Sequence, residues 1–131
     1  MKSRALLLLL LAIASFSCGT EPIREPALYV VTVDSLVHPI SVSLGDTVTL
    51  RFFGTIGPDG CHHFSSIEVD MEPLQVNLTV WGAYSNEGAC PQVVVYLNGA
   101  PWRFVAFQTG WFLINIHQPD GGALRDLLMV L

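Results

Sequence analysis

Cysteine and histidine carry the most reactive side chains of this chain, and several of them lie around one turn. The run Gly57-Pro58-Asp59-Gly60-Cys61-His62-His63 places Cys61 directly after residues that favour a tight turn, and Cys90 follows downstream. Cys61 should therefore lie where a loop enters a strand. We predict a disulfide between Cys61 and Cys90. By closing a loop of about 30 residues it would reduce the entropy of the unfolded chain and stabilise the fold by about 3 to 4 kcal/mol.

A metal site is the alternative use of these side chains. The chain has four histidines, which are His38, His62, His63 and His117. The run Gly45-Asp46-Thr47-Val48-Thr49-Leu50-Arg51-Phe52, followed by histidine, resembles cupredoxins, and this resemblance implies a copper site of His62 or His63 with His117. That family also needs a thiolate and usually an axial methionine close together on one late loop, whereas Cys90, His117 and Met129 are far apart in sequence. We therefore expect no metal or other cofactor and keep the copper protein as the alternative.

The histidine pair itself argues against a shared ion. His62 and His63 are adjacent on a predicted strand, so their side chains point to opposite faces. Catalysis has even less support, because the chain contains no nucleophile elbow, no recognisable pair of carboxylates and no His-Glu-x-x-His motif. We expect the protein not to be an enzyme.

A row of polar side chains is the candidate ligand-binding surface. Gln75, Asn77, Thr79 and Trp81 alternate with apolar residues, so they should share the outward face of one strand. An aromatic ring beside amides suits contact with carbohydrate or peptide. The alternative interpretation is an ordinary solvated sheet face, with Trp81 folded over its rim.

The first residues predict export. Lys2 and Arg4 precede an apolar run of about a dozen residues, which matches a secretory signal peptide over residues 1–17 and is too short to span a bilayer. Ser15 and Ser17 lead to Cys18, and this arrangement resembles the lipobox of bacterial lipoproteins, which implies that Cys18 is lipidated and becomes the first mature residue. The alternative is a secreted protein with a free Cys18.

The number of cysteines and the net charge of the chain both favour lipidation of Cys18. One acylated cysteine and one disulfide account for all three cysteines in an oxidising compartment. Loss of Lys2 and Arg4 would leave the protein two units more negative than the −5 of the whole chain. Such a protein lacks the basic surface that nucleic acids or a polybasic membrane contact require, so a lipid is the expected anchor. Gly19 after the cysteine implies sorting to the outer membrane if the host has two membranes.

The rest of the chain predicts a short tether, residues 18–26, and one all-β domain, residues 27–131. The expected strands are 27–33, 40–44, 46–53, 61–71, 74–81, 93–97, 102–107, 111–117 and 126–131. We expect a bulge near Ser65-Ser66, a hairpin turn at Asn98-Gly99 and a central position for 93–97, which is apolar on both faces. Eight or nine short strands separated by turns indicate an antiparallel β-sandwich.

Two motifs resemble the immunoglobulin-like domains of bacterial envelope proteins. They are Gly45-Asp46-Thr47-Val48-Thr49-Leu50 and Gly110-Trp111-Phe112-Leu113-Ile114-Asn115-Ile116. The resemblance implies a lipid-anchored protein of the bacterial cell envelope, whose domain is a non-enzymatic binding or structural module in the periplasm or outside the cell. Its expected partners are the membrane, through the N-terminal lipid, and a protein or glycan at the envelope.

Overall fold

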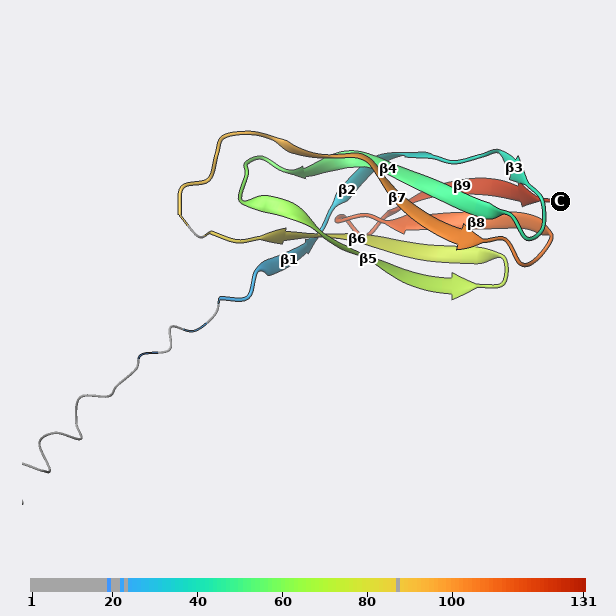
Figure 1. Cartoon of the computed structure of the whole chain (residues 1–131), viewed down its shortest axis with the longest axis horizontal. Coiled ribbons are helices and arrows are strands. Elements are labelled where there is room, and N and C mark those ends of the chain that lie inside the picture. Colours follow the sequence, from blue (N-terminus) through green and yellow to red (C-terminus); the bar gives the residue numbers. More distant parts are fainter. Residues whose placement is uncertain (1–18, 20–21, 23, 87) are drawn as a thin grey trace, which may run out of the picture.

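The computed structural model describes residues 19, 22, 24–86 and 88–131 (Figure 1). The predicted signal peptide, residues 1–17, and the predicted lipidation site Cys18 lie outside these residues. None of the described segments forms a helix of the length and hydrophobicity needed to cross a membrane.

Nine strands make up the described domain, in agreement with the all-β prediction. They are β1 (Ala27–Val30), β2 (Thr32–Val37), β3 (Ser41–Val42), β4 (Thr47–Gly57), β5 (His62–Glu72), β6 (Gln75–Tyr84), β7 (Val95–Val105), β8 (Gly110–His117) and β9 (Ala123–Val130). The predicted first strand divides in two at the buried Val31, because the chain passes there from one sheet to the other.

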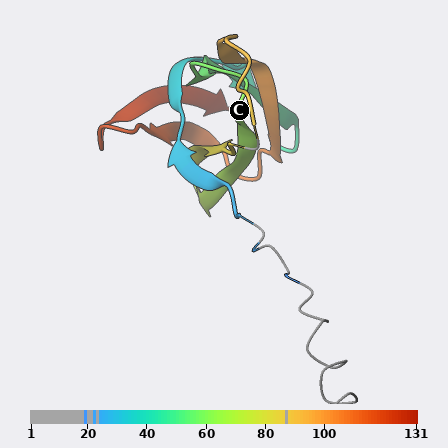
Figure 2. The ribbon, with the colours of Figure 1, turned by 90° about the vertical axis from the view of Figure 1, so that its left-hand side faces the viewer.

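The strands form two sheets around one core. The larger sheet is organised on β6, which pairs with β5 along one edge, while β8 and β1 share its other edge at residues 75–78 and 81–84. β9 and β3 continue this sheet beyond β8, and the smaller sheet has the order β2-β4-β7. In the end-on view the larger sheet curls strongly, so that the two sheets together surround the interior (Figure 2).

The prediction of a purely antiparallel sandwich was wrong. β6 pairs with β8 in parallel, with Val76 opposite Ile114, and β3 pairs with β9 in parallel. The reason is the path of the chain: after β6 it crosses to the smaller sheet as β7 and returns as β8 in the same direction as β6. The result is a mixed, curled sheet facing a three-stranded antiparallel sheet.

Alternating apolar residues form the core, as their spacing predicts. In β4 the side chains of Val48, Leu50 and Phe52 are fully buried, and the apolar positions of β6 and β8 meet them from the other sheet. Because side chains alternate across a strand, the residues between them face outward. Burial of the apolar residues on one side of β6 therefore means that the residues between them lie on its outward side.

The Asn98-Gly99 hairpin prediction was wrong, although its conformational basis was sound. Gly99 adopts a positive φ of 75°, but β7 continues through it, with Asn98 opposite Phe53 and Ala100 opposite Phe52. Gly99 is thus the extra residue of a β-bulge, a second structure that a positive-φ glycine permits. The bulge predicted near Ser65-Ser66 is confirmed by the register shift between Phe64 and Ser66.

The predicted central position of residues 93–97 was also wrong. β7 is an edge strand that pairs with β4 alone in the described structure. Val93, Val94 and Tyr96 are 62%, 43% and 62% exposed, so apolar residues on both faces did not signify burial here.

Candidate functional site

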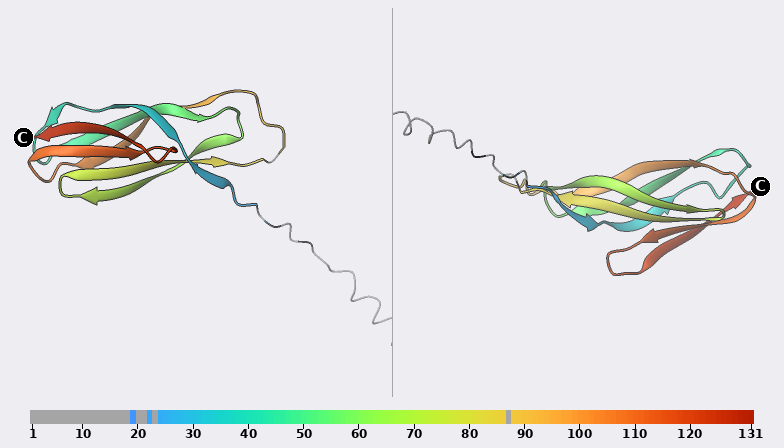
Figure 3. Two further views of the ribbon diagram at one scale, coloured as in Figure 1. Left: turned by 180° about the vertical axis from the view of Figure 1, so that it is seen from behind. Right: turned by 90° about the horizontal axis from the view of Figure 1, so that it is seen from below.

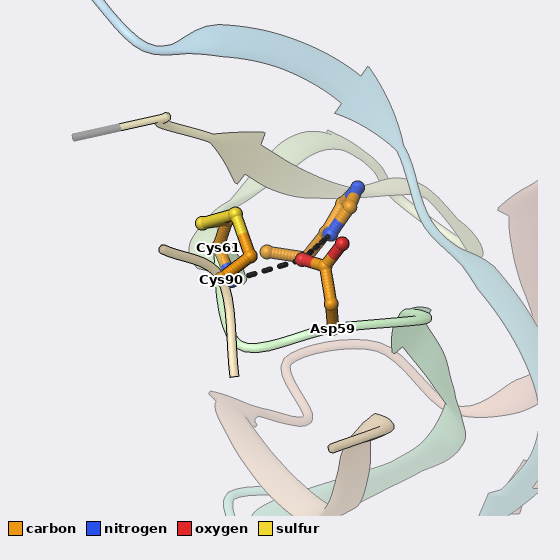
Figure 4. The surroundings of a disulfide bond; sticks show 4 residues. Asp59, Cys61 and Cys90 are labelled. Atoms are coloured by element: carbon orange, nitrogen blue, oxygen red, sulfur yellow. Dashed lines mark hydrogen bonds and ion pairs between the residues drawn. A yellow bond between two sulfur atoms is a disulfide. The ribbon is translucent and has the colours of Figure 1, made fainter. Parts of the chain in front are cut away.

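The disulfide joins the two ends of the segment that contains β5 and β6. Cys61 and Cys90 are 29 residues apart in sequence, and their Cα atoms lie 5.1 Å from each other. Asp59 organises the adjoining turn, because its Oδ1 accepts the backbone N–H of Cys61 at 2.9 Å and Nδ1 of His62 at 2.8 Å (Figure 4). The hydrogen bond from His62, and then that from Cys61, lowers the pKa of the Asp59 carboxyl below its ordinary value.

The ring of His62 is packed between two tyrosines. It lies edge-on to Tyr29, with 5.7 Å between ring centroids, and 4.8 Å from the ring of Tyr84. Gly57 leaves space for the His62 ring, and Gly82 leaves space for the ring of Tyr29. Tyr29 donates its hydroxyl to the carbonyl of Ile56 at 2.7 Å, and burial followed by the charge of Asp59 raises its pKa. This cluster links β1 to the start of β5 across β6, which pairs with both.

The structure does not bring together the histidines of the copper alternative. His62 lies opposite Tyr84 of β6, whereas His117 follows Ile116, which lies opposite Leu78. About five residues of β6 separate the two positions, or roughly 17 Å along the strand. His63 is exposed and, as the neighbour of His62, points to the other face.

The described residues contain one group of three possible metal ligands, formed by Asp59, Cys61 and Cys90 within 4.8 Å of one another. Both sulfurs are committed to the disulfide, so the group offers a single carboxylate to an ion. The fourth histidine, His38, lies outside this group and pairs with Asp126, with 3.0 Å between Nε2 and Oδ2.

The polar row of β6 has the geometry that its alternation predicts. Gln75, Asn77, Thr79 and Trp81 share the outward face, and all four are half-buried rather than fully exposed. Neighbouring strands extend this row into a larger surface, which we call the polar face. Its members are Gln75, Asn77, Thr79 and Trp81 of β6, Glu68, Asp70 and Glu72 of β5, Asn115 and His117 of β8, and Arg125 of β9.

One line of the polar face runs directly across four strands. The register places Asp70 opposite Asn77, Asn77 opposite Asn115, and Asn115 opposite Arg125. Asn115 Nδ2 donates to Asn77 Oδ1 at 3.0 Å, and Arg125 Nε donates to Asn115 Oδ1 at 3.2 Å. Gln75 Nε2 also donates to Asn77 Oδ1, at 2.8 Å. Asn77 is therefore the centre of a side-chain network that fixes its amide plane.

The β5 side of the polar face carries uncompensated negative charge. Glu68 accepts the indole N–H of Trp81 at 2.8 Å, and Glu72 accepts Asn77 Nδ2 at 3.4 Å. No arginine or histidine of the described residues lies within ion-pair distance of Glu68, Asp70 or Glu72. Between these carboxylates and β8 the surface is hollowed by about 320 Å³, lined by Glu68, Asp70, Asn77, Thr79 and His117.

Sequence reasoning found the β6 row but missed its neighbours. A signal for Glu68, Asp70 and Glu72 was present, because carboxylates at every second position of a strand share one face. Asn115 and His117 had no such signal, since their proximity to Asn77 depends on the parallel pairing of β6 with β8. Trp81 donates its indole N–H to Glu68, one of the carboxylates that line the hollow.

A second and larger hollow lies on the smaller sheet. It measures about 760 Å³ and is lined mainly by apolar side chains of β4 and of the segment 93–97, with Asp34 as its one charged residue. Among the described residues, no side-chain hydrogen bond joins the polar groups of this hollow, whereas such bonds fix Gln75, Asn77 and Asn115 on the polar face. We therefore treat the polar face as the candidate site. No protein-family model, curated protein or solved structure matches this chain.

Proposed function

We propose that this protein is a non-enzymatic binding module of the bacterial cell envelope, held at the membrane by a lipid on Cys18, and that the polar face is its recognition surface. The observation that carries the proposal is the network centred on Asn77, in which amides from β6 and β8 and a guanidinium from β9 hold one another in place. Groups fixed before binding lose less conformational entropy when a ligand arrives.

The chemistry of the face suits a ligand rich in hydrogen-bond donors. Within the part of the chain that the structure describes, Glu68, Asp70 and Glu72 have no cation at ion-pair distance. The hollow lined by Glu68, Asp70 and His117 is open to solvent. Carboxylates accept hydrogen bonds and do not donate them when ionised. Sugar hydroxyls and protonated amines both provide matching donors, so a glycan or a basic protein segment at the envelope fits the face.

The framework supports such a role. We propose that the domain is an immunoglobulin-like support modified by its two parallel strand pairs. Two observations support this proposal: two sheets enclose one core, and residues 47–50 of the motif that carries the resemblance belong to β4. Rigid strands hold side chains more accurately than loops do. The polar face lies on strands throughout.

Binding is tested by titrating the protein with an N-acetylglucosamine oligomer and, separately, with an oligolysine peptide, using calorimetry. We expect saturable binding of at least one probe. Asn77→Ala should weaken that binding about tenfold, because it removes the oxygen that accepts hydrogen bonds from Gln75 and Asn115. The side chains of these two residues would then no longer be held in place. Thr47→Ala, a matched polar change on the exposed side of β4, should leave it unchanged. Binding of neither probe, or equal losses in both variants, would refute the proposal.

Anchoring is tested separately in cells grown with a palmitate analogue. The wild-type protein should incorporate the label, and Cys18→Ala should not, because the lipid is attached to the sulfur of that residue. Cys61→Ser is the matched control and should retain the label. Equal labelling of wild type and Cys18→Ala would show that another residue, or none, carries the lipid.

A further inference from the structure

β5 presents a free backbone edge along the polar face. It pairs with β6 through its whole length, and its other side has no backbone hydrogen bond from the described residues over residues 66–72. Figure 1 shows β5 along the lower border of the domain, and the reverse view in Figure 3 shows the same border uncovered. We call residues 66–72 the edge segment. Unpaired N–H and C=O groups of this kind are a template for an added strand.

The two sides of the edge segment differ in chemistry. Glu68, Asp70 and Glu72 point to the polar face, opposite Thr79, Asn77 and Gln75 of β6. Ile67, Val69 and Met71 alternate with them on the inner side, where Ile67 and Met71 pack against the core and Val69 remains 38% exposed. A strand added here would meet carboxylates with one set of alternate side chains and apolar groups with the other.

The edge segment is protected by negative charge alone, through Glu68, Asp70 and Glu72. Proteins block such edges with charged side chains, above all lysine, and with proline or bulges. β7, one of the two edge strands of the smaller sheet, has two of these features, the bulge at Gly99 and Pro101. The edge segment contains no lysine, proline or bulge, since the bulge of β5 lies before it at Ser65. Its carboxylates repel another acidic edge but attract a basic strand.

We propose that the edge segment binds an extended segment of a partner protein in which basic and apolar residues alternate, and that this segment pairs with β5 as an additional strand. The proposal rests on the proposed function, because the β5 carboxylates belong to the polar face. Charge complementarity selects the partner: lysine or arginine side chains at alternate positions would face Glu68, Asp70 and Glu72. The apolar residues between them would cover Val69.

A second copy of this chain is a poor occupant of the same edge. Pairing two edge segments would bring two rows of three carboxylates onto one face, and like charges on facing strands are destabilising. A basic partner meets no such repulsion. Its binding should also weaken as salt is added, because the carboxylates are exposed and screened by ions.

The test uses the full-length protein in a neutral detergent and a capped peptide as long as the edge segment, in which lysine and valine alternate. A control peptide has the same composition with all lysines placed before all valines. Hydrogen exchange of the β5 amides is followed with each peptide. We expect the alternating peptide to bind about tenfold more tightly than the control and to slow exchange of the edge-segment amides that point away from β6. Equal binding by both peptides, or unchanged exchange in β5, would overturn the proposal.

Charge variants distinguish binding at the edge segment from attraction of a basic peptide to the negatively charged protein as a whole. Asp70→Asn should weaken binding of the alternating peptide about two- to fivefold, as expected for an exposed ion pair, and Glu25→Gln, a matched loss of charge outside the polar face, should not. Equal effects of the two variants would also overturn the proposal. If the N-acetylglucosamine oligomer binds through Asn77 while the alternating peptide does not bind, the edge proposal fails alone. If the N-acetylglucosamine oligomer, the oligolysine peptide and the alternating peptide all fail to bind the polar face, both proposals fail.

Discussion

Reduction of the disulfide should destabilise the domain without changing its fold. The bond joins cysteines that are 29 positions apart in sequence, and the loop that it closes contains all of β5 and β6. In the chain-entropy model a loop of this length reduces the entropy of the unfolded chain enough to contribute about 3.5 kcal/mol to the free energy of unfolding at 25 °C. For a domain of this size, that change corresponds to a fall in melting temperature of roughly 10 to 20 °C.

The assay is thermal unfolding followed by circular dichroism, with and without a phosphine reductant. The variant Cys61→Ser/Cys90→Ser should melt at the temperature of the reduced wild type, and the reductant should not shift it further. Pairing along β5 and β6 does not depend on the bridge, so the strand content at 20 °C should be retained. A loss below about 1 kcal/mol, or a reductant effect on the double variant, would refute this reasoning.

Three further predictions concern packing and pH. Gly82→Ala would place a methyl group 2.6 Å from Cζ of Tyr29, whose hydroxyl is hydrogen-bonded, so chemical denaturation should show a loss of about 1 to 3 kcal/mol, and an unchanged midpoint would contradict this packing. Leu78→Ala empties a fully buried position and should cost about 2 to 5 kcal/mol in the same assay, whereas a cost below about 1 kcal/mol would mean that the core collapses around it. The carboxyls of Asp59 and Asp126 have pKa values lowered by hydrogen bonds from histidines and backbone amides. Their stabilisation is present above the unfolded pKa of about 4 and is lost as the pH falls through the folded values, so the melting temperature should drop below about pH 4, less steeply in Asp59→Asn, and an identical acid profile would contradict it.

The sequence predicted features that depend on neighbouring residues. Alternation identified Val48, Leu50 and Phe52 as core, and the parity change around Ser65 and Ser66 identified the bulge. Both signals are local, because the two faces of a strand are set by its own side chains. The turn before Cys61 likewise placed that residue at the start of a strand, where the disulfide forms.

Strand pairing between distant segments could not be predicted in the same way. Asn98-Gly99 specifies a positive φ, but whether a turn or a bulge uses it depends on the strand opposite, which is β4. The parallel pair of β6 and β8 depends on where the chain returns after crossing to the other sheet. For this reason the row around Asn77 was predicted, while its links to Asn115 and Arg125 required the structure.

The polar face is tested most directly by nuclear magnetic resonance of the isotope-labelled protein during titration with the oligolysine peptide and with the N-acetylglucosamine oligomer. We predict saturable chemical-shift changes at Asp70, Asn77 and Asn115, which lie side by side across β5, β6 and β8. The amides of Phe53 and Tyr96, at the larger hollow of the smaller sheet, should keep their shifts. Saturable changes at that hollow, with none on β5, β6 and β8, would contradict the assignment of the polar face as the binding surface.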